Sequence, residues 1–392
     1  MARTPPRKIP SQVFAGQATT IFTVMSALAR QHEAINLGQG FPDEDGPREI
    51  RARAARALLD GPNQYPPMRG LPGLQEAVAR HNRRFYGLEF DPATEVLVTS
   101  GATEALSDCF LALLDPGDEA IVFEPVYDCY RPMIERAGAR AVPIRLEPSD
   151  WHLPKAALAA AFGPRTKLIV VNSPMNPCSK VFDDEELSLI AELCVRHDVY
   201  AIGDEVYEHL TFDGRHHRPL LTFPGMRDRA IKIGSAGKSF ALTGWKIGYL
   251  CGAPALIDAV AQAHQFNTFT TSPALQIAIA EALDLPRSYF EGLAGELQRK
   301  RDRLAEGLDA LGFEVLACEG TYFLSCGYGG LGLDGTPDEV CKMLTREAKV
   351  ATIPLSAFYA DGDCGPYLRF CFCKRDDVLS EALARLRRFL RT

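Results

Sequence analysis

The sequence predicts an α/β fold with a mostly parallel sheet, followed by a smaller α+β domain. Between about residues 47 and 285, short apolar runs alternate with longer amphipathic runs, which is the order of elements in a sheet covered by helices. Several apolar runs are continuous in Val, Ile and Leu, as is typical of strands buried on both faces. After about residue 286, a long charged helical run and separate strand runs indicate the second domain.

The elements can be placed in chain order from these patterns. A short helix is expected over Ile21–Arg30, and a strand fragment begins at Ile35. Six strands of the large sheet are predicted at Glu95–Thr99, Ala120–Phe123, Leu168–Val171, Tyr200–Gly203, Ala230–Ile233 and Ile247–Cys251. Amphipathic runs predict helices between them at Thr103–Leu114, Asp183–His197 and Pro254–His264. The second domain is expected to contain helices at Ser288–Leu311, Asp338–Glu347 and Asp376–Leu390 and strands at Phe313–Leu316, Tyr322–Ser325 and Tyr367–Phe372.

The chain of 392 residues is long enough for two to three domains, at roughly 150 residues each. We expect an N-terminal arm and part of the small domain at residues 1–46. A large domain is expected at 47–285 and a small C-terminal domain at 286–392. The first ten residues are rich in proline and basic side chains, and we expect them to form a loose arm.

Charge and cysteine content argue against several classes of protein. With 43 basic and 50 acidic residues the formal net charge is −7, which argues against a nucleic-acid binder. No secretory signal or membrane helix is expected, because no apolar run approaches roughly 18 residues. Eleven scattered cysteines do not suggest a disulfide framework, and no metal site is expected at Cys371-Phe-Cys373, which has no second Cys/His pair nearby. These features predict reduced thiols in a cytoplasmic protein.

Glycines and polar residues follow the predicted strands, at the sheet edge where ligands of such folds bind. The run Ser-Gly-Ala-Thr at 100–103 stands where a helix begins. Free N–H groups there could bind an anion, and the alternative is ordinary N-capping. The proline-rich run from Asn172 to Pro177 follows a later strand; its asparagines either present an amide to a ligand or form a plain turn.

A carboxylate and a lysine follow the next two strands. Asp204 comes directly after a buried strand, where it either meets a cation or strong donor or caps a helix. Lys238 stands in a glycine-serine turn, and Lys232 occupies the position where a phosphate-binding P-loop requires glycine, which excludes that motif. Lys238 is therefore either a solvated charge or a lysine that can lose its proton and act as a nucleophile.

An arginine, Arg369, stands inside the last apolar strand run. A buried arginine needs an anion, and a substrate carboxylate would fit it bidentately; the alternative is a salt bridge to an acid of the protein. Taken together, the strand ends supply a lysine able to form a Schiff base, an acid, an amide and an anion-binding helix start. Tyr207, three residues after Asp204, adds a phenol. Pyridoxal phosphate (PLP) needs this set of groups.

These motifs resemble those of the class I aminotransferases of PLP fold type I, and they occur in the family's order. The matching runs are Asn172-Ser-Pro-Met-Asn-Pro, Asp204-Glu-Val-Tyr207, Gly234-Ser-Ala-Gly-Lys-Ser, Gly244-Trp-Lys-Ile-Gly and Leu368-Arg-Phe. Further runs are similar to the kynurenine/glutamine transaminase branch: Leu37-Gly-Gln-Gly-Phe-Pro-Asp, Asn63-Gln-Tyr, Glu124-Pro-Val-Tyr-Asp-Cys-Tyr and Arg369-Phe-Cys-Phe. The stretch 19–29 looks most like bacterial methionine aminotransferases. The resemblance spans about residues 10–390 and implies a large domain with a mostly parallel sheet of seven strands.

The resemblance implies a role for each matching catalytic residue. Lys238 would hold PLP through a Schiff base and, once freed by substrate, would move the α-proton. Asp204 would pair with the pyridine nitrogen, and Tyr207 and Asn176 would hydrogen-bond the ring hydroxyl.

The resemblance also implies the residues that bind cofactor and substrate. Tyr127 would stack on the ring, and the phosphate would be bound by Ala102, Thr103, Ser235 and Lys246, with Tyr65 reaching in from a neighbouring subunit. Arg369 would bind the substrate α-carboxylate with help from Gly40 and Asn176. Phe22 of the same chain would line the side-chain pocket together with Phe269 of the partner subunit.

The implied activity is a ping-pong transfer from an amino acid to a 2-oxo acid in a homodimer with shared active sites, without nucleic acid or membrane. Residues 266–271 contain no Arg, Lys or His, so methionine, glutamine and aromatic donors, kynurenine among them, are expected over acidic ones. Two alternatives stay open. The run 40–47 is similar to N-succinyl-LL-diaminopimelate aminotransferases, and a cysteine-conjugate C–S β-lyase would use the same residues.

Three positions depart from the family pattern. Ser179 stands where many members have glycine, so the local backbone is expected to differ slightly. Lys246 replaces a common arginine, and Thr270 replaces a histidine of some branch members, which leaves the side-chain preference open.

Overall fold

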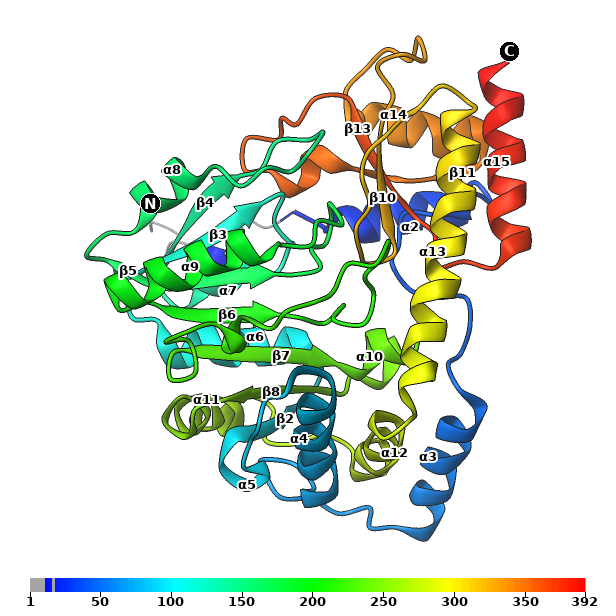
Figure 1. Ribbon diagram of the computed structural model, residues 1–392. Coiled ribbons are helices and arrows are strands. Elements are labelled where there is room, and N and C mark those ends of the chain that lie inside the picture. Colours follow the sequence, from blue (N-terminus) through cyan, green and yellow to red (C-terminus); the bar gives the residue numbers. More distant parts are fainter. Residues whose placement is uncertain (1–10, 16–17, 392) are drawn as a thin grey trace, which may run out of the picture.

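The computed structural model describes residues 11–15 and 18–391 (Figure 1), so the arm expected at residues 1–10 lies outside the described residues. Its centre is a sheet of seven strands in the order β2–β8–β7–β6–β5–β3–β4. Strand β8 runs antiparallel to its neighbours, and the other adjacent pairs are parallel. The strands span Val96–Thr99 (β2), Glu119–Glu124 (β3), Arg140–Arg145 (β4), Thr166–Asn172 (β5), Tyr200–Asp204 (β6), Ala230–Ser235 (β7) and Gly248–Gly252 (β8).

Both faces of this sheet are buried beneath helices, which explains the continuous apolar runs. In β3, for example, Ala120 and Val122 face one core and Ile121 and Phe123 face the other. The first face is covered by α6 (Ala102–Leu113), α7 (Tyr130–Arg136) and α11 (Pro254–Asn267). The second is covered by α4 (Pro72–Tyr86), α9 (Asp184–His197), α12 (Pro273–Leu283) and α13 (Arg287–Asp309). The remaining helical elements of this part of the chain are α3 (Arg48–Asp60), α5 (Pro92–Glu95), α8 (Lys155–Ala161), α10 (Ala236–Ser239), η1 (Leu220–Thr222) and η2 (Thr243–Trp245).

The predicted sheet is confirmed, with one strand added. All six predicted strands are present, and their ends differ from the prediction by at most two residues. The seventh is β4, which no apolar run indicated. It lies at the sheet edge, where Arg140 and Pro143 are exposed and Ile144 is its one buried residue. An edge strand of this kind lacks the continuous apolar signal.

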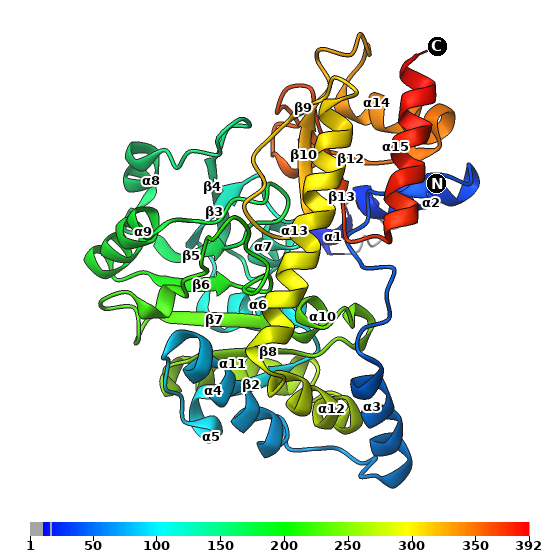
Figure 2. The ribbon, with the colours of Figure 1, turned by 45° about the vertical axis from the view of Figure 1, so that its right-hand side comes forward.

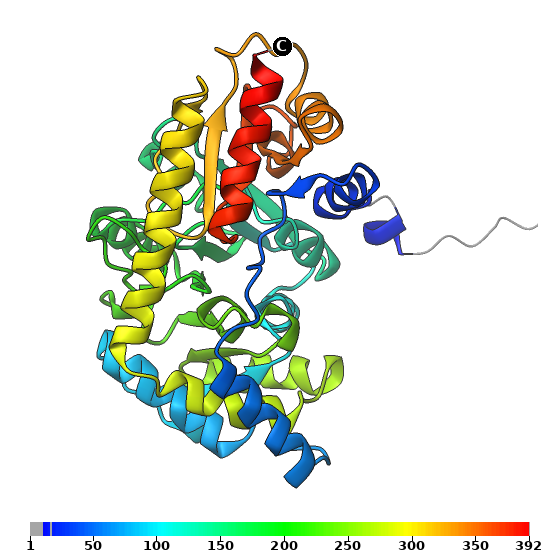
Figure 3. The same cartoon turned by 90° about the vertical axis from the view of Figure 1, so that its right-hand side faces the viewer.

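The C-terminal part forms a second, antiparallel sheet in the order β12–β13–β10–β9, and β1 pairs with β11. The long helix α13 runs from the large sheet to this smaller one, where α15 packs beside it (Figures 2 and 3). The predicted boundary at 285/286 falls between α12 and α13, and the domain division stays a prediction. The elements are α1 (Gln12–Ala15), α2 (Ile21–Gln31), β1 (Ile35–Asn36), β9 (Glu314–Val315), β10 (Phe323–Gly327), α14 (Pro337–Met343), η3 (Leu344–Ala348), β11 (Val350–Ala351), β12 (Ile353–Pro354), η4 (Leu355–Phe358), β13 (Tyr367–Cys371) and α15 (Asp376–Leu390).

The strand directions bring distant segments to one edge of the large sheet. Strands β2, β5, β6 and β7 all end there, and the antiparallel β8 begins there. The residues just before β8 therefore meet those that end the other strands. None of the described helices is both long enough and apolar enough to cross a membrane.

Candidate active site

A pocket lies at this edge of the large sheet and collects the polar residues of the strand ends. Asn172, Asp204 and Ser235 are the last residues of β5, β6 and β7, whereas the sequence predicted that they follow these strands. Nine residues predicted from the sequence line the pocket together: Ala102, Thr103, Tyr127, Asn176, Asp204, Tyr207, Ser235, Lys238 and Lys246.

Lys238 lies in the short helix α10, directly after β7, and its amine has no carboxylate partner among the residues that the structure describes. The Nζ atom donates a hydrogen bond to Tyr322 Oη at 2.9 Å, and Tyr322 Oη donates to the carbonyl of Gly40 at 2.9 Å. Burial lowers the pKa of Lys238 because desolvation disfavours the charged form. The residue is therefore not a solvated surface charge but an amine that can act as a nucleophile.

Asp204 is buried and keeps one carboxylate oxygen free. Tyr130 Oη donates to Oδ2, whereas Oδ1 is buried without a hydrogen-bond partner. Burial raises the pKa of Asp204 to about 6, although the bond from Tyr130 acts in the opposite direction. Asp204 does not cap a described helix. An unpartnered buried oxygen is costly, so this atom is suited to a donor that a ligand brings into the pocket.

The N-terminus of α6 is open toward the same pocket. Its N-cap is Gly101, and no side chain caps the helix, so the capping alternative is not what the structure shows. The start of β8 packs closely on this turn, since a Cβ on Gly248 would lie 2.6 Å from the carbonyl carbon of Gly101. Lys246 lies over the turn, with Nζ 3.2 Å from where a side chain on Gly101 would begin. Free N–H groups beside an ammonium form an anion site.

Arg369 lies in β13, fully buried, and its guanidinium contacts three aromatic rings. The Phe323 centroid is 3.9 Å from Cζ, and those of Phe22 and Phe358 are 5.2 and 5.4 Å away. Nη1 donates to Asn176 Oδ1 at 2.8 Å and Nη2 to the carbonyl of Gly38 at 2.7 Å, while Nε is unpartnered.

The alternative of a structural salt bridge to Arg369 is wrong for the described part of the chain, where no carboxylate lies within 4.0 Å of this guanidinium. Burial lowers the pKa of Arg369 to about 10. A buried cation with only neutral partners is stabilised by a carboxylate that fits its planar edge.

The remaining predicted residues lie around or away from this pocket. Gly40 packs against Phe323, because a Cβ there would lie 2.5 Å from the ring. Tyr65 is 83% exposed and Phe269 39% exposed. Their rings contact each other edge-on at 5.5 Å, and neither lines the pocket of its own chain. Their assignment to a partner's site stays a prediction.

Two residues of the site, Tyr130 and Tyr322, were not singled out from the sequence. Tyr130 bonds Asp204, and Tyr322 bonds Lys238. Asn172, one of the two asparagines weighed for an amide contact, donates from Nδ2 to the carbonyl of Asp204 at 2.8 Å and accepts from the N–H of Asn176 at 2.8 Å. Tyr130 stood within a quoted motif, so a signal existed for it. Tyr322 stood at the start of a predicted strand, and nothing local pointed to Lys238, 84 positions away.

Ser179 shows how a departure from the family pattern is accommodated. Its φ is +65°, the left-handed conformation that glycine adopts more readily. Its hydroxyl pairs with that of Thr321 at 2.8 Å and donates to the carbonyl of Phe323 at 2.7 Å. The side chain thus gains two hydrogen bonds in a conformation that serine rarely adopts.

Comparison with known proteins places this geometry in a family. The family model of class I and II aminotransferases matches residues 32–386. The chain is 46% identical to a probable N-succinyldiaminopimelate aminotransferase of Mycobacterium tuberculosis, over 94% of this chain and 96% of that protein. It is 41% identical to the methionine aminotransferase of Escherichia coli, over 97% and 98% of the two chains. Mouse kynurenine–oxoglutarate transaminase 3 is 38% identical, over 94% and 87%.

Solved structures of such aminotransferases have the same fold as this chain. The N-succinyldiaminopimelate aminotransferase of M. tuberculosis has a TM-score of 0.94 at 45% identity, covering 96% of this chain and 99% of that one. The E. coli protein identified as a methionine aminotransferase has a TM-score of 0.94 at 39% identity, covering 97% and 100%.

Proposed function

The chain belongs to the class I and II aminotransferases, and on that premise we propose a PLP-dependent transfer from methionine, glutamine or aromatic amino acids, kynurenine among them, to a 2-oxo acid. PLP supplies an electrophilic carbonyl and an electron-withdrawing ring. One observation carries the proposal: the amine of Lys238, the unpartnered Oδ1 of Asp204 and the uncapped start of α6 converge on one pocket. Together they offer a nucleophile, an acceptor for a ring N–H and a site for a phosphate.

Each side chain then has a physical task. Lys238 binds the cofactor and afterwards takes and returns the proton at the substrate Cα, for which its lowered pKa suits it. Asp204, which Tyr130 holds in place, would accept the ring N–H at Oδ1. The N–H groups of Ala102 and Thr103, with Ser235 and Lys246, would hold the phosphate. Tyr127, Tyr207 and Asn176 would contact the ring and its hydroxyl.

Arg369 would bind the α-carboxylate of the donor through the guanidinium edge that carries the unpartnered Nε. Asn176 and the carbonyl of Gly38 orient the guanidinium. The aromatic rings beside it exclude water, which strengthens the ion pair. Bidentate binding fixes Cα relative to Lys238 and contributes to rate through positioning.

The side-chain preference follows from the cations near the site. An acidic donor needs a second arginine, and the two candidates are already paired: Arg131 contacts Glu124 and Arg69 contacts Asp258. Phe22 and Tyr127 offer apolar surface instead. Burying a methionine or phenylalanine side chain there contributes roughly 1.5–3 kcal/mol, whereas an unpaired buried carboxylate costs several kcal/mol.

N-succinyl-LL-diaminopimelate is the second candidate donor. The probable N-succinyldiaminopimelate aminotransferase of M. tuberculosis is 46% identical to this chain. For this substrate one of the paired arginines would have to exchange its partner. The distal carboxylate of such a donor would replace Glu124 or Asp258 as the acceptor.

A half-reaction screen decides between these donors. Each amino acid is added alone to the PLP-loaded enzyme, and conversion of the lysine-bound cofactor to the amine form is followed by absorbance. We expect methionine, glutamine and phenylalanine to exceed aspartate about 10-fold or more in kcat/KM. Faster conversion by succinyl-diaminopimelate would favour the second candidate. Pyruvate release from cystathionine without an oxo acid would indicate β-lyase activity.

We also propose a homodimer and a cytoplasmic location. The mutual contact of the exposed Tyr65 and Phe269 supports the first, since both are implied to complete a partner's site. All eleven cysteines are free, which a reducing compartment maintains.

A further inference from the structure

Two clusters that contain buried histidines lie outside the pocket. In one of them, the hydrogen-bond geometry requires a charged imidazole ring. The imidazole of His264 is fully buried at the end of α11. Nδ1 lies 2.7 Å from Glu104 Oε1 and 3.4 Å from Asp108 Oδ2, and Nε2 lies 3.1 Å from the carbonyl of Met68. Carboxylates and carbonyls only accept hydrogen bonds, so both ring nitrogens must donate. His264 is therefore an imidazolium.

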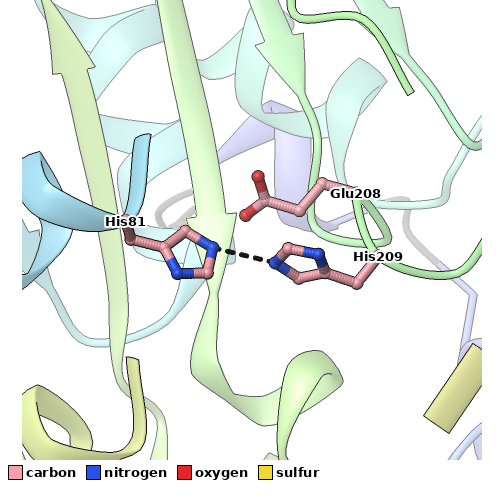
Figure 4. Close-up of side chains that lie close together, drawn as sticks. All are labelled: His81, Glu208 and His209. Carbon is pink, nitrogen blue, oxygen red and sulfur yellow. Dashed lines mark hydrogen bonds between the residues drawn. The ribbon is translucent and has the colours of Figure 1, made fainter. Parts of the chain in front are cut away.

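A second cluster provides the contrast. His81 Nδ1 faces the carbonyl of Leu283 at 3.3 Å, and Nε2 faces His209 Nε2 at 2.8 Å (Figure 4). Nδ1 must donate, so Nε2 accepts from His209 and both rings can be neutral. Burial lowers the pKa of His81 to about 4. For His264 burial acts in the same direction, but hydrogen bonds to Asp108 and Glu104 raise its pKa to about 9.

The charged cluster stands directly behind the anion site. Glu104 lies in the first turn of α6. Its Oε2 accepts the N–H of Ser100, the first residue of the segment 100–103 that leads into α6, which we call the phosphate turn. Asp108 is one helical turn further along and accepts from Asn267 Nδ2 at 3.0 Å. Without His264, two carboxylates would stand behind the turn at which a phosphate binds, and like charges repel at this range.

The same imidazolium joins three segments of the chain. Its carboxylate partners belong to α6, the ring itself to the end of α11, and Met68 to the loop that follows Tyr65. The chain continues from α11 to Phe269, whose N–H bonds the carbonyl of His264 at 2.9 Å. The phosphate turn and the two segments implied to reach a partner subunit are thus tied to one side chain.

We propose that His264 is a positioning residue for the cofactor phosphate: its single positive charge offsets one of the two negative charges of Glu104 and Asp108 behind the α6 turn, and its contacts fix that turn to the Tyr65 and Phe269 segments. The inference rests on the proposed PLP chemistry and adds to it a residue that does not touch the cofactor. If His264 has this role, the loss of cofactor affinity in a variant without it depends on the charge of the neighbouring carboxylates and on the phosphate group of the cofactor.

The test compares PLP with pyridoxal, which lacks the phosphate. We expect His264→Gln to weaken PLP binding about 5- to 10-fold more than pyridoxal binding, because an uncompensated carboxylate opposes the phosphate. Adding Glu104→Gln removes that charge, so the double variant should regain a PLP-to-pyridoxal affinity ratio within about twofold of wild type. A purely structural role predicts that the double variant binds PLP no better than the single one.

His81→Gln is the matched control, because it removes another buried histidine without touching the phosphate turn. It should lower stability and leave the PLP-to-pyridoxal ratio unchanged. An unchanged ratio in His264→Gln, or no recovery in the double variant, would overturn the inference. If the wild-type protein binds neither PLP nor pyridoxal, the proposed function fails instead. A ¹⁵N-histidine NMR spectrum then still tests the charge: an imidazolium signal at pH 8 that His264→Gln removes.

Discussion

At the scale of single residues, the site is marked by buried polar atoms without partners. Asp204 Oδ1 and Arg369 Nε are both buried and unpaired, although such atoms normally find a hydrogen bond. Both lie where the proposed chemistry needs a contact, one to the cofactor ring and one to the substrate carboxylate. Their cost in the free protein is offset when ligands bind, which is the arrangement expected of a binding site.

Lys238→Ala should abolish the visible absorption of bound PLP and all transamination while leaving the fold intact, because an amine is needed to bind the cofactor carbonyl. Absorbance, activity and far-UV circular dichroism check this, with the exposed Lys155→Ala as control. Borohydride reduction and peptide mapping give an independent reading. A label on Lys246 in place of Lys238 would show that the assignment is wrong.

Arg369→Gln should raise KM for the amino donor strongly and lower kcat/KM by about 100-fold or more, because the variant loses a charge-assisted bidentate pair worth roughly 3 kcal/mol. PLP binding should change little, since Arg369 does not line the cofactor pocket. Steady-state kinetics with methionine and an absorbance titration with PLP measure the two effects separately. Equal losses in both would mean that the variant disturbs the whole site.

At the scale of elements, the sequence predicts the strands and motifs that nearby residues determine. It misses the features that depend on contacts between distant elements. The buried strands of the large sheet were recognised from Val, Ile and Leu runs, and the strand ends led to the pocket. Strand β4 was missed because an edge strand needs no continuous apolar run. Tyr322 was missed because its contact with Lys238 arises only when β10 docks on the large sheet.

The buried contact of His264 in α11 with Glu104 and Asp108 in α6 predicts a pH dependence of the free energy of unfolding. The pKa of His264 is raised in the folded state to about 9, above the unfolded value of about 6.5. Its stabilisation is therefore fully present below pH 6.5 and is lost as pH rises through 9. We expect the free energy of unfolding to fall by on the order of 2–3 kcal/mol across that window. Urea unfolding at pH 6.5, 8 and 9.5 measures it.

His264→Gln removes the titrating group, so its unfolding free energy should vary much less over the same window. The control variant His81→Gln should change this slope little, because His81 is uncharged in the folded state throughout the range and its unfolded-state titration near pH 6.5 contributes less than about 0.5 kcal/mol. Parallel curves for wild type and His264→Gln would contradict the assignment of the charge to His264.

At the scale of the whole molecule, several large apolar side chains remain exposed in three segments of the chain. They occur at the end of α3, in the loop after it and at the end of α11, which is unusual for a monomer. The exposed residues are Leu58, Leu59, Tyr65, Phe266 and Phe269. A two-fold partner that covers this surface would place Tyr65 and Phe269 beside the other subunit's pocket.

Subunit exchange tests this arrangement. Tyr65→Ala and Lys238→Ala each inactivate a different half of a shared site, so a mixed dimer contains one site with both residues intact. With half of the dimers mixed and one active site in each, activity at limiting PLP should recover to about a quarter of wild type. The control mixture is Lys238→Ala with Arg369→Gln, two residues of one chain's site, and it should stay inactive. No recovery in the Tyr65→Ala and Lys238→Ala mixture, or a fully active monomer in sedimentation, would show that the sites are not shared in this way. Recovery in the control would show that Lys238 and Arg369 of different chains serve one site.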